Sequence, residues 1–342
     1  MKLHRTLAIA AAIALAAGIQ AAADWPITEK LDLDAIFKIK EEGLTPQRSK
    51  VMEIESYLTD VYGPRLTGSP EAREAADWTE KTMKEWGLAN VHAETFPFGR
   101  GWHNERFTAV AVSPRAFPII GYPKAWTPGT NGPVTGEATV AVIESDKDFD
   151  QFRGKLRGKY VLTADMRDVP AHFSALGHRY TEEELNELSL QPEPNGRGNF
   201  RPNPERLAFQ KKKMQFYADE GVAALVDPSP RGDGGTVFVQ SPQGVSRDPK
   251  DPLQPAQVVV AIEHYGRIFR MLQKHVPVTL QMDIQNKFFD ADQNSFNIVG
   301  EIPGSDKADE IVMLGAHFDS WHGATGATAN AAGISPTMLN EF

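Results

Sequence analysis

Apolar residues at helical spacing predict two helices near the start of the chain. One face of the first carries four of them: Val51, Ile54, Leu58 and Val61. A threonine N-cap followed by a proline at the first helical position predicts that this helix begins at Thr45–Pro46. The second helix is expected to begin at Ser69–Pro70 and to end at Gly87. Alternating apolar and polar residues over 91–98 then predict a half-buried strand.

Between about residues 119 and 284, short strands alternate with helices. The expected strands are Ala138–Ile143, Lys159–Ala164 and Val222–Val226, and the expected helices are Phe149–Leu156 and Pro204–Glu220. This β-α-β-α-β series predicts a compact α/β module with its own sheet. The run Lys211–Lys213 on the longer helix is interpreted as a solvated face. The polar stretch 167–201 is interpreted as a surface excursion.

The last stretch returns to strands. Asn297–Ile302 is predicted to be a strand, Pro303–Asp306 a turn, and Glu310–Ala316 a buried strand that ends at His317. The fold class expected from the whole pattern is α/β. The two outer stretches would form a partial mixed sheet with flanking helices, and the α/β module would be inserted between them.

Composition narrows the classes of function. The chain has 342 residues, of which 41% are hydrophobic and 24% are charged, as in an ordinary globular protein. A formal net charge of -9 argues against nucleic acid as a partner, because phosphate binding needs a basic surface. Cysteine is absent, so disulfides and Cys-ligated metals are excluded, and a metal would have to use His, Asp or Glu.

The first residues have the pattern of a secretory signal peptide. Basic residues precede the apolar run Leu7–Ile19, and the small residues Ala21–Ala23 then fit a cleavage site before Asp24. The alternative, a membrane anchor, is disfavoured because the run is shorter than the ~20 residues that a membrane-spanning helix needs. The mature protein is therefore expected to be secreted or periplasmic and to have no membrane span.

A possible site for chemistry lies within Ile311–Gly323. His317 and Asp319 are two residues apart at the end of a predicted apolar strand, so their side chains would point to the same side. Ligands bind near the carboxyl ends of strands in open α/β sheets. A carboxylate can hold one ring nitrogen of a histidine whose other nitrogen binds a metal. The same pattern also fits a polar strand end in which the histidine has no functional role.

Two segments resemble a known family. Residues Gly315–Ser320, followed by the glycine-bounded stretch 323–333, closely resemble the signature of the co-catalytic zinc aminopeptidases. Residues Tyr57–Ser69 resemble the N-terminal segment of the same family, and its carboxypeptidase Q-like branch is the nearest match. The middle stretch resembles the protease-associated domain that many members carry. The resemblance covers almost all of the chain after the predicted signal peptide.

The resemblance implies a domain organisation. It divides the chain into a signal peptide (1–23), an N-terminal part of a peptidase domain (24–118), a protease-associated insert (119–285) and a continuation of the peptidase domain (286–342). The chain is expected to be truncated at its C-terminus, because the family's glutamate pair, another acidic ligand and a last histidine would follow later.

The resemblance also implies roles for individual residues. His317 matches a ligand of one of two zinc ions, and Asp319 matches the catalytic-site carboxylate that orients this histidine. The family motif Gly-Ala-Thr-Asp-Asn corresponds to residues 326–330, so Ala329 stands where the family has an aspartate that bridges both metals. His322 is interpreted as a residue at the mouth of the pocket or in solvent. The aromatic residues of 96–102 are interpreted as packing residues, or as the lining of a substrate cleft.

Two functions are therefore carried forward. The first is a secreted zinc-dependent exopeptidase that hydrolyses terminal bonds of a peptide or dipeptide substrate, with this chain itself inactive because most ligands and the general base are absent. The alternative is a non-catalytic secreted protein whose inserted module binds a peptide or a partner.

Overall fold

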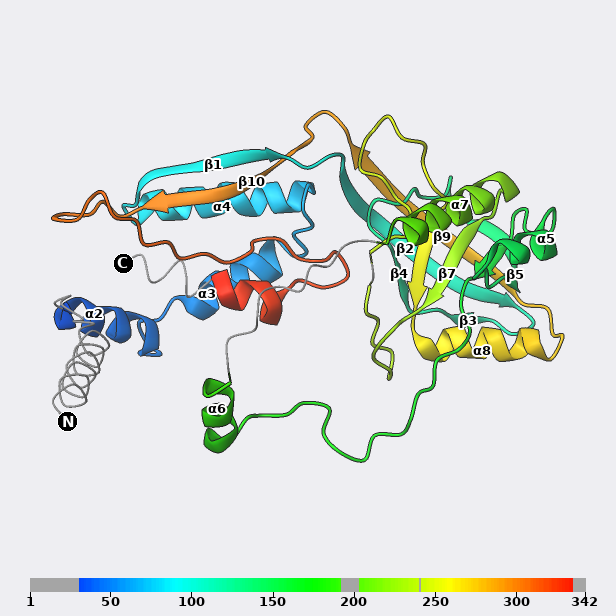
Figure 1. Ribbon diagram of the computed structural model, residues 1–342, viewed down its shortest axis with the longest axis horizontal. Helices are drawn as coiled ribbons and strands as arrows, with labels where there is room; N and C mark the ends of the chain where they lie inside the picture. Colours follow the sequence, from blue (N-terminus) through cyan, green and yellow to red (C-terminus); the bar gives the residue numbers. More distant parts are fainter. Residues whose placement is uncertain (1–30, 192–202, 240, 335–342) are drawn as a thin grey trace, which may run out of the picture. The chain divides into compact units, whose positions relative to one another are not determined.

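The computed structural model describes residues 31–191, 203–239 and 241–334 (Figure 1). The predicted signal peptide lies outside these residues. The described part divides into two compact units, and the boundary between them along the chain falls between Lys50 and Val51. The first contains helix α2 (Leu33–Leu44), whose N-cap Asp32 accepts a hydrogen bond from the backbone N–H of Ala35. Everything below concerns the second unit.

The second unit begins with helix α3 (Val51–Ser56), which continues as a π-helical turn, η1 (Tyr57–Val61). The predicted helix start at Thr45–Pro46 is wrong, because residues 46–48 form a turn instead. Ile54 and Leu58 are buried as expected, whereas Val61 is 62% exposed. The wider π-helical turn rotates Val61 away from the buried face, which a regular helical spacing cannot anticipate.

Helix α4 (Pro70–Glu85) has both predicted ends. Ser69 accepts a hydrogen bond from the backbone N–H of Ala72, and Pro70 occupies the first turn. Gly87 follows the helix with a φ of 92°, a conformation that glycine adopts without strain. Strands β1 (Ala89–Pro97) and β10 (Asn294–Glu301) pair antiparallel beside α4 (Figure 1), and both match predicted strands.

The remaining strands form one eight-stranded mixed sheet in the order β3-β2-β9-β5-β6-β7-β8-β4. Their bounds are β2 Gly101–Ser113, β3 Phe117–Pro118, β4 Gly121–Pro123, β5 Val134–Val140, β6 Tyr160–Leu162, β7 Ala224–Pro228, β8 Gln257–Val260 and β9 Thr279–Phe289. Strands β5 to β8 are parallel neighbours, and the other pairs are antiparallel. The edge strands β3 and β4 are joined only by Ile119 and Ile120, so the sheet curls back on itself.

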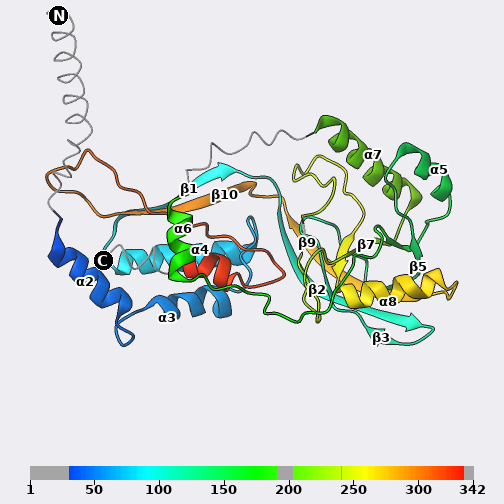
Figure 2. The same ribbon diagram turned by 60° about the horizontal axis from the view of Figure 1, so that its bottom comes forward.

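Helices cover both faces of the parallel part of this sheet (Figures 1 and 2). Helix α7 (Pro204–Glu220) and the short α5 (Phe149–Phe152) pack on one face, and α8 (Ile262–Gln273) packs on the other. Both faces are therefore apolar, which explains the continuous apolar runs in β6, β7 and β8. The predicted β-α-β-α-β series and the bounds of α7 are confirmed. The other short helical segments are η2 (Asp146–Asp148), α6 (Glu182–Ser189) and η3 (Ala327–Ala331).

The mixed α/β fold class is confirmed. The eight-stranded sheet includes β2 and β3, which precede residue 119, and β9, which extends past residue 285. The domain boundaries given above, and the protease-associated identity of the module, stay predictions. Within the residues that the structure describes, no helix has the length and apolar character to span a membrane.

The predicted buried strand Glu310–Ala316 is wrong. These residues have no regular structure, and Ile311, Val312 and Met313 are 86%, 92% and 85% exposed. A strand needs a neighbour for its backbone hydrogen bonds. No strand of the described residues pairs with this segment. An apolar composition therefore does not make a strand of it here.

Candidate functional site

His317 and Asp319 lie in the irregular segment that precedes η3. The Nδ1 atom of His317 lies 3.1 Å from Oδ1 of Asp319, and the two side chains are 64% and 50% exposed. The structure thus brings the two predicted site residues into hydrogen-bond contact, although they do not end a buried strand. The carboxylate can accept the Nδ1 proton, which would leave the other ring nitrogen, Nε2, with its lone pair in the ring plane. Their roles in metal binding and catalysis stay predictions.

The second oxygen of the Asp319 carboxylate is also bound. Thr67 donates its hydroxyl proton to Oδ2 of Asp319 at 2.5 Å. Thr67 belongs to the early segment that resembles the family, whereas Asp319 belongs to the late one. The carboxylate is therefore held between a hydroxyl and an imidazole, which fixes its orientation relative to His317.

Arg65 joins the same two segments through its backbone and side chain. It is fully buried. Its backbone N–H donates to Oγ of Ser320, and its carbonyl accepts from the backbone N–H of Ser320, both at 2.9 Å. Its guanidinium donates to four carbonyl oxygens, those of Phe318 (3.1 Å), Thr325 (3.0 Å), Gly63 (2.9 Å) and Leu58. Irregular backbone on both sides of Asp319 is therefore bonded to one side chain.

Electrostatics support a charged guanidinium at this position. Burial lowers the pKa of Arg65, and the negative charge of Asp319 acts in the opposite direction. Because arginine has the highest pKa of the basic side chains, it stays protonated.

Asn330 lies against the imidazole of His317. Its amide nitrogen is 2.8 Å from Nδ1 and 2.7 Å from Nε2, and it donates to the carbonyl of Asp319 at 2.7 Å. An atom at nearly equal distance from both ring nitrogens cannot lie in the ring plane without overlapping the carbon between them. The amide therefore lies over the ring face and leaves the in-plane lone pair of Nε2 accessible.

Trp321 and His322 continue this segment onto the eight-stranded sheet. Nε2 of His322 donates to the carbonyl of Pro123 at 2.6 Å, and the imidazole meets the ring of Trp102 edge-on with centroids 4.8 Å apart. Trp321 meets Trp126 edge-on at 6.3 Å. The expectation that His322 faces solvent or a pocket mouth is wrong, because it is docked against β2. Burial lowers its pKa, and Trp102 is a fully buried packing residue as expected.

A complete zinc centre does not form from these residues. Catalytic zinc sites use three protein ligands and structural sites use four. Within the described parts of the chain, no group of three or more His, Asp or Glu side chains is placed to hold a metal ion. His317 has the features of one ligand, since it is accessible and bonded to a carboxylate. The set as a whole does not fit a zinc ion, and we derive no catalytic step through one.

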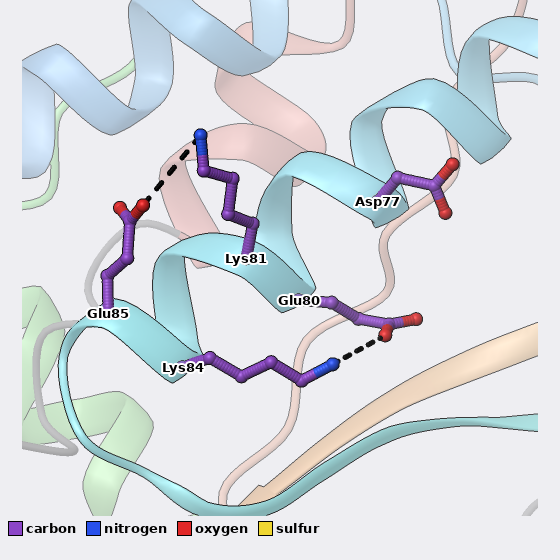
Figure 3. Close-up of a pocket in the computed structure, with 5 residues that line it drawn as sticks. All are labelled: Asp77, Glu80, Lys81, Lys84 and Glu85. Carbon is purple, nitrogen blue, oxygen red and sulfur yellow. Dashed lines mark hydrogen bonds and ion pairs between the residues drawn. The ribbon is translucent and has the colours of Figure 1, made fainter.

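A hollow lies elsewhere, on helix α4 (Figure 3). Its volume is 430 Å³, and it is lined by five charged residues: Asp77, Glu80, Lys81, Lys84 and Glu85. All five belong to α4, and they pair along it, with Lys84 to Glu80 at 3.4 Å and Lys81 to Glu85 at 3.7 Å. Such exposed pairs are common on solvated helix faces. This hollow is therefore not a candidate site.

Sequence reasoning did not identify Arg65, Thr67 and Asn330 as site residues. The first two lie in Tyr57–Ser69, which was recognised only as a family segment. A charged residue in a Gly-Pro-Arg turn is ordinarily a surface residue, so its complete burial has no local signal. The contact between this segment and Gly315–Ser320 could have been predicted, because both segments resemble parts of the same family signature.

Comparison with known proteins supports the assignment of these segments. Residues 297–340 match the model of peptidase family M28. The chain is 26% identical to carboxypeptidase Q from Pongo abelii over 305 residues, which cover 87% of this chain and 55% of that protein. It is 25% identical to human carboxypeptidase Q over 303 residues, with the same coverage. The chain thus spans about half the length of the curated relatives that it matches.

A solved structure has a similar fold. The peptidase M28 precursor from Shewanella amazonensis superposes with a TM-score of 0.55 at 20% identity, covering 89% of this chain and 61% of that one. This likeness supports the mixed α/β fold. The chain is thus similar to peptidase family M28 over residues 297–340 and to carboxypeptidase Q over most of its length.

Proposed function

We propose that this chain carries part of a secreted zinc-dependent exopeptidase that removes residues from the end of a peptide. In this proposal His317 is one zinc ligand and Asp319 is the carboxylate that orients it. The described residues alone do not complete the catalytic centre. Zinc would polarise the scissile carbonyl and activate water in a complete centre. The proposal also includes an exported location, which rests on the signal-peptide pattern of the first residues.

The observation that carries the proposal is the chain of contacts from Thr67 through Asp319 to His317. A metal-binding histidine commonly donates its other ring N–H to a carboxylate that is itself held by a hydrogen bond. That arrangement occurs here, with distances of 2.5 Å and 3.1 Å. The match of residues 297–340 to peptidase family M28 and the similarity to carboxypeptidase Q support it.

The experiment measures peptide hydrolysis with matched substrates. A dipeptide with both ends free is compared with the same dipeptide acetylated at its amino end and with one amidated at its carboxyl end, each with and without added zinc. We expect no chelator-sensitive turnover from this chain. Turnover that depends on a free terminus would support the exopeptidase class but contradict the inactivity. Equal turnover of the free and the blocked dipeptides would contradict the class.

A variant tests the proposed role of position 329. Ala329→Asp supplies the carboxylate that the family motif has there, and we expect it to tighten zinc binding about tenfold or more because an anionic ligand is added beside His317. Ala327→Asp adds the same charge two residues away and should have little effect. Equal gains in both variants would show a general charge effect and would contradict the bridging position.

A second function is favoured by the lack of a three-ligand group among the described residues. In this alternative the chain is a secreted protein that binds a peptide or a partner without cleaving it. Saturable binding of the free dipeptide, unchanged in His317→Ala and without turnover, would favour this alternative. Binding lost in His317→Ala would favour the exopeptidase site.

A further inference from the structure

A small cavity lies at the carboxyl ends of the parallel strands β6 and β7, and His317 is not among the residues that line it. Its volume is 170 Å³, room for about five water molecules. Its lining comes from four places: Thr163 and Ala164 after β6, Asp227 and Pro228 at the end of β7, Lys213 on α7, and Gln243 in the loop between β7 and β8. The carboxyl ends of parallel strands are where open α/β sheets bind ligands.

The carboxylate in this cavity is already satisfied. Lys124, which is fully buried, donates its ammonium to Oδ2 of Asp227. Thr163 donates its hydroxyl to Oδ1. The Lys124–Asp227 pair is therefore neutral overall, and both oxygens of its carboxylate are occupied.

Lys213 supplies a second ammonium that has no such partner. No hydrogen bond or ion pair joins it to any other residue in the described structure, although it is half-buried. Burial lowers its pKa, while Asp227 and Glu144 act in the opposite direction. Its neighbours Lys211 and Lys212 are exposed, and Lys212 pairs with Asp146 at 2.8 Å. The interpretation of Lys211–Lys213 as one solvated face is thus wrong for Lys213, because α7 turns it toward the sheet.

We propose that this cavity binds a small monovalent carboxylate, with Lys213 as its counter-ion and the side-chain amide of Gln243 as a second donor. Half-burying an unpaired ammonium is unfavourable, and an anion in the cavity would compensate it. Lys124 neutralises Asp227, and the negative field of Glu144 reduces the positive charge of Lys213, so these groups leave at most one net positive charge at the cavity. A doubly charged phosphate is disfavoured for the same reason. The volume suits an ion of the size of acetate.

The experiment titrates the protein with acetate at constant pH and ionic strength, and follows the side-chain Cε resonance of Lys213 by NMR. Acetamide has the same shape without the charge, and inorganic phosphate and chloride test the class of anion. We expect a saturable shift with acetate at millimolar concentration. Acetamide and chloride should give none, and phosphate should bind at least tenfold more weakly than acetate.

Variants separate this site from general charge effects. K213Q should abolish the saturable response of nearby resonances, K213R should retain it within about tenfold, and K211Q should match the unaltered protein within twofold. If K213Q does not fold, the titration of the unaltered protein with the four ligands still tests the proposal. Tighter binding of phosphate, an equal response to chloride, or an unchanged response in a folded K213Q would each overturn the proposal.

Discussion

The eight-stranded sheet and the segment that carries His317 satisfy their polar groups in different ways. In the sheet, backbone groups pair along the strands, and the buried ion pair joins Lys124, which follows β4, to Asp227 in β7. The segment around His317 has no strand partner, and its carbonyls are bonded largely to one arginine, Arg65. The comparison teaches that irregular backbone at a site can be held by a single buried side chain. It also implies that the two regions should respond differently to substitution.

The largest effect is expected in the sheet. Lys124→Met leaves Asp227 buried with only Thr163 as a partner, and we expect a loss of about 3–5 kcal/mol in the free energy of unfolding. Lys212→Met removes an exposed pair and should cost less than about 1 kcal/mol. Denaturant unfolding of both variants measures the difference. Similar losses in the two variants would contradict the buried character of the Lys124–Asp227 pair.

Substitution of Arg65 should act on the segment of His317. Arg65→Ala removes the donor of several buried carbonyls, and we expect local destabilisation of about 3 kcal/mol. Amide hydrogen exchange at Ser320 should then accelerate about a hundredfold, while amides of β6 and β7 exchange as before. Arg73→Ala, which removes an exposed pair with Asp77 at 3.0 Å, is the control. If the amide of Ser320 exchanges as slowly in Arg65→Ala as in the unaltered protein, Arg65 does not hold this segment.

A pH series tests the docking of His322. Its folded pKa lies below the ordinary 6.5, chiefly through burial, with the nearby His103 acting in the same direction and the bond to Pro123 opposing it. Below pH 6.5 the unfolded chain therefore binds more protons at this residue. The stabilisation from the neutral ring should be complete above pH 6.5 and decline as pH falls toward the folded pKa. His322→Phe should have a flatter stability profile between pH 5 and 7. An unchanged slope would show that the ring is solvated.

The smallest effect concerns Thr67. Thr67→Val removes the hydroxyl that donates to Asp319, and we expect a loss of about 1 kcal/mol or less because the site is partly exposed. The more sensitive readout is the ring nitrogen shifts of His317, which should move as its carboxylate partner loosens. Thr67→Ser keeps the hydroxyl and should preserve them. Identical shifts in both variants would argue against an orienting role.

The sequence predicted the elements whose signals are local. Helix α7 was bounded correctly by Pro204 and Gly221, and α4 by Ser69 and Gly87, because caps and stops depend on neighbouring residues. The long strands β2 and β9 were missed. Their burial alternates irregularly, and their pairing joins residues far apart in the chain.

The site was predictable only in part. The contact of His317 with Asp319 follows from their spacing, but the environment of both residues depends on Arg65 and Thr67, which are distant in the chain. The apolar run before His317 was mistaken for a buried strand, because periodicity shows that a segment could be buried without showing what would pair with it.

Zinc binding tests the central claim most directly, namely that the described residues orient His317 without completing a metal centre. The protein would be dialysed against micromolar free zinc and its metal content measured beside that of His317→Ala. We predict less than one zinc ion per chain, lowered further in the variant. Two tightly held zinc ions per chain, or a content that His317→Ala leaves unchanged, would contradict the account.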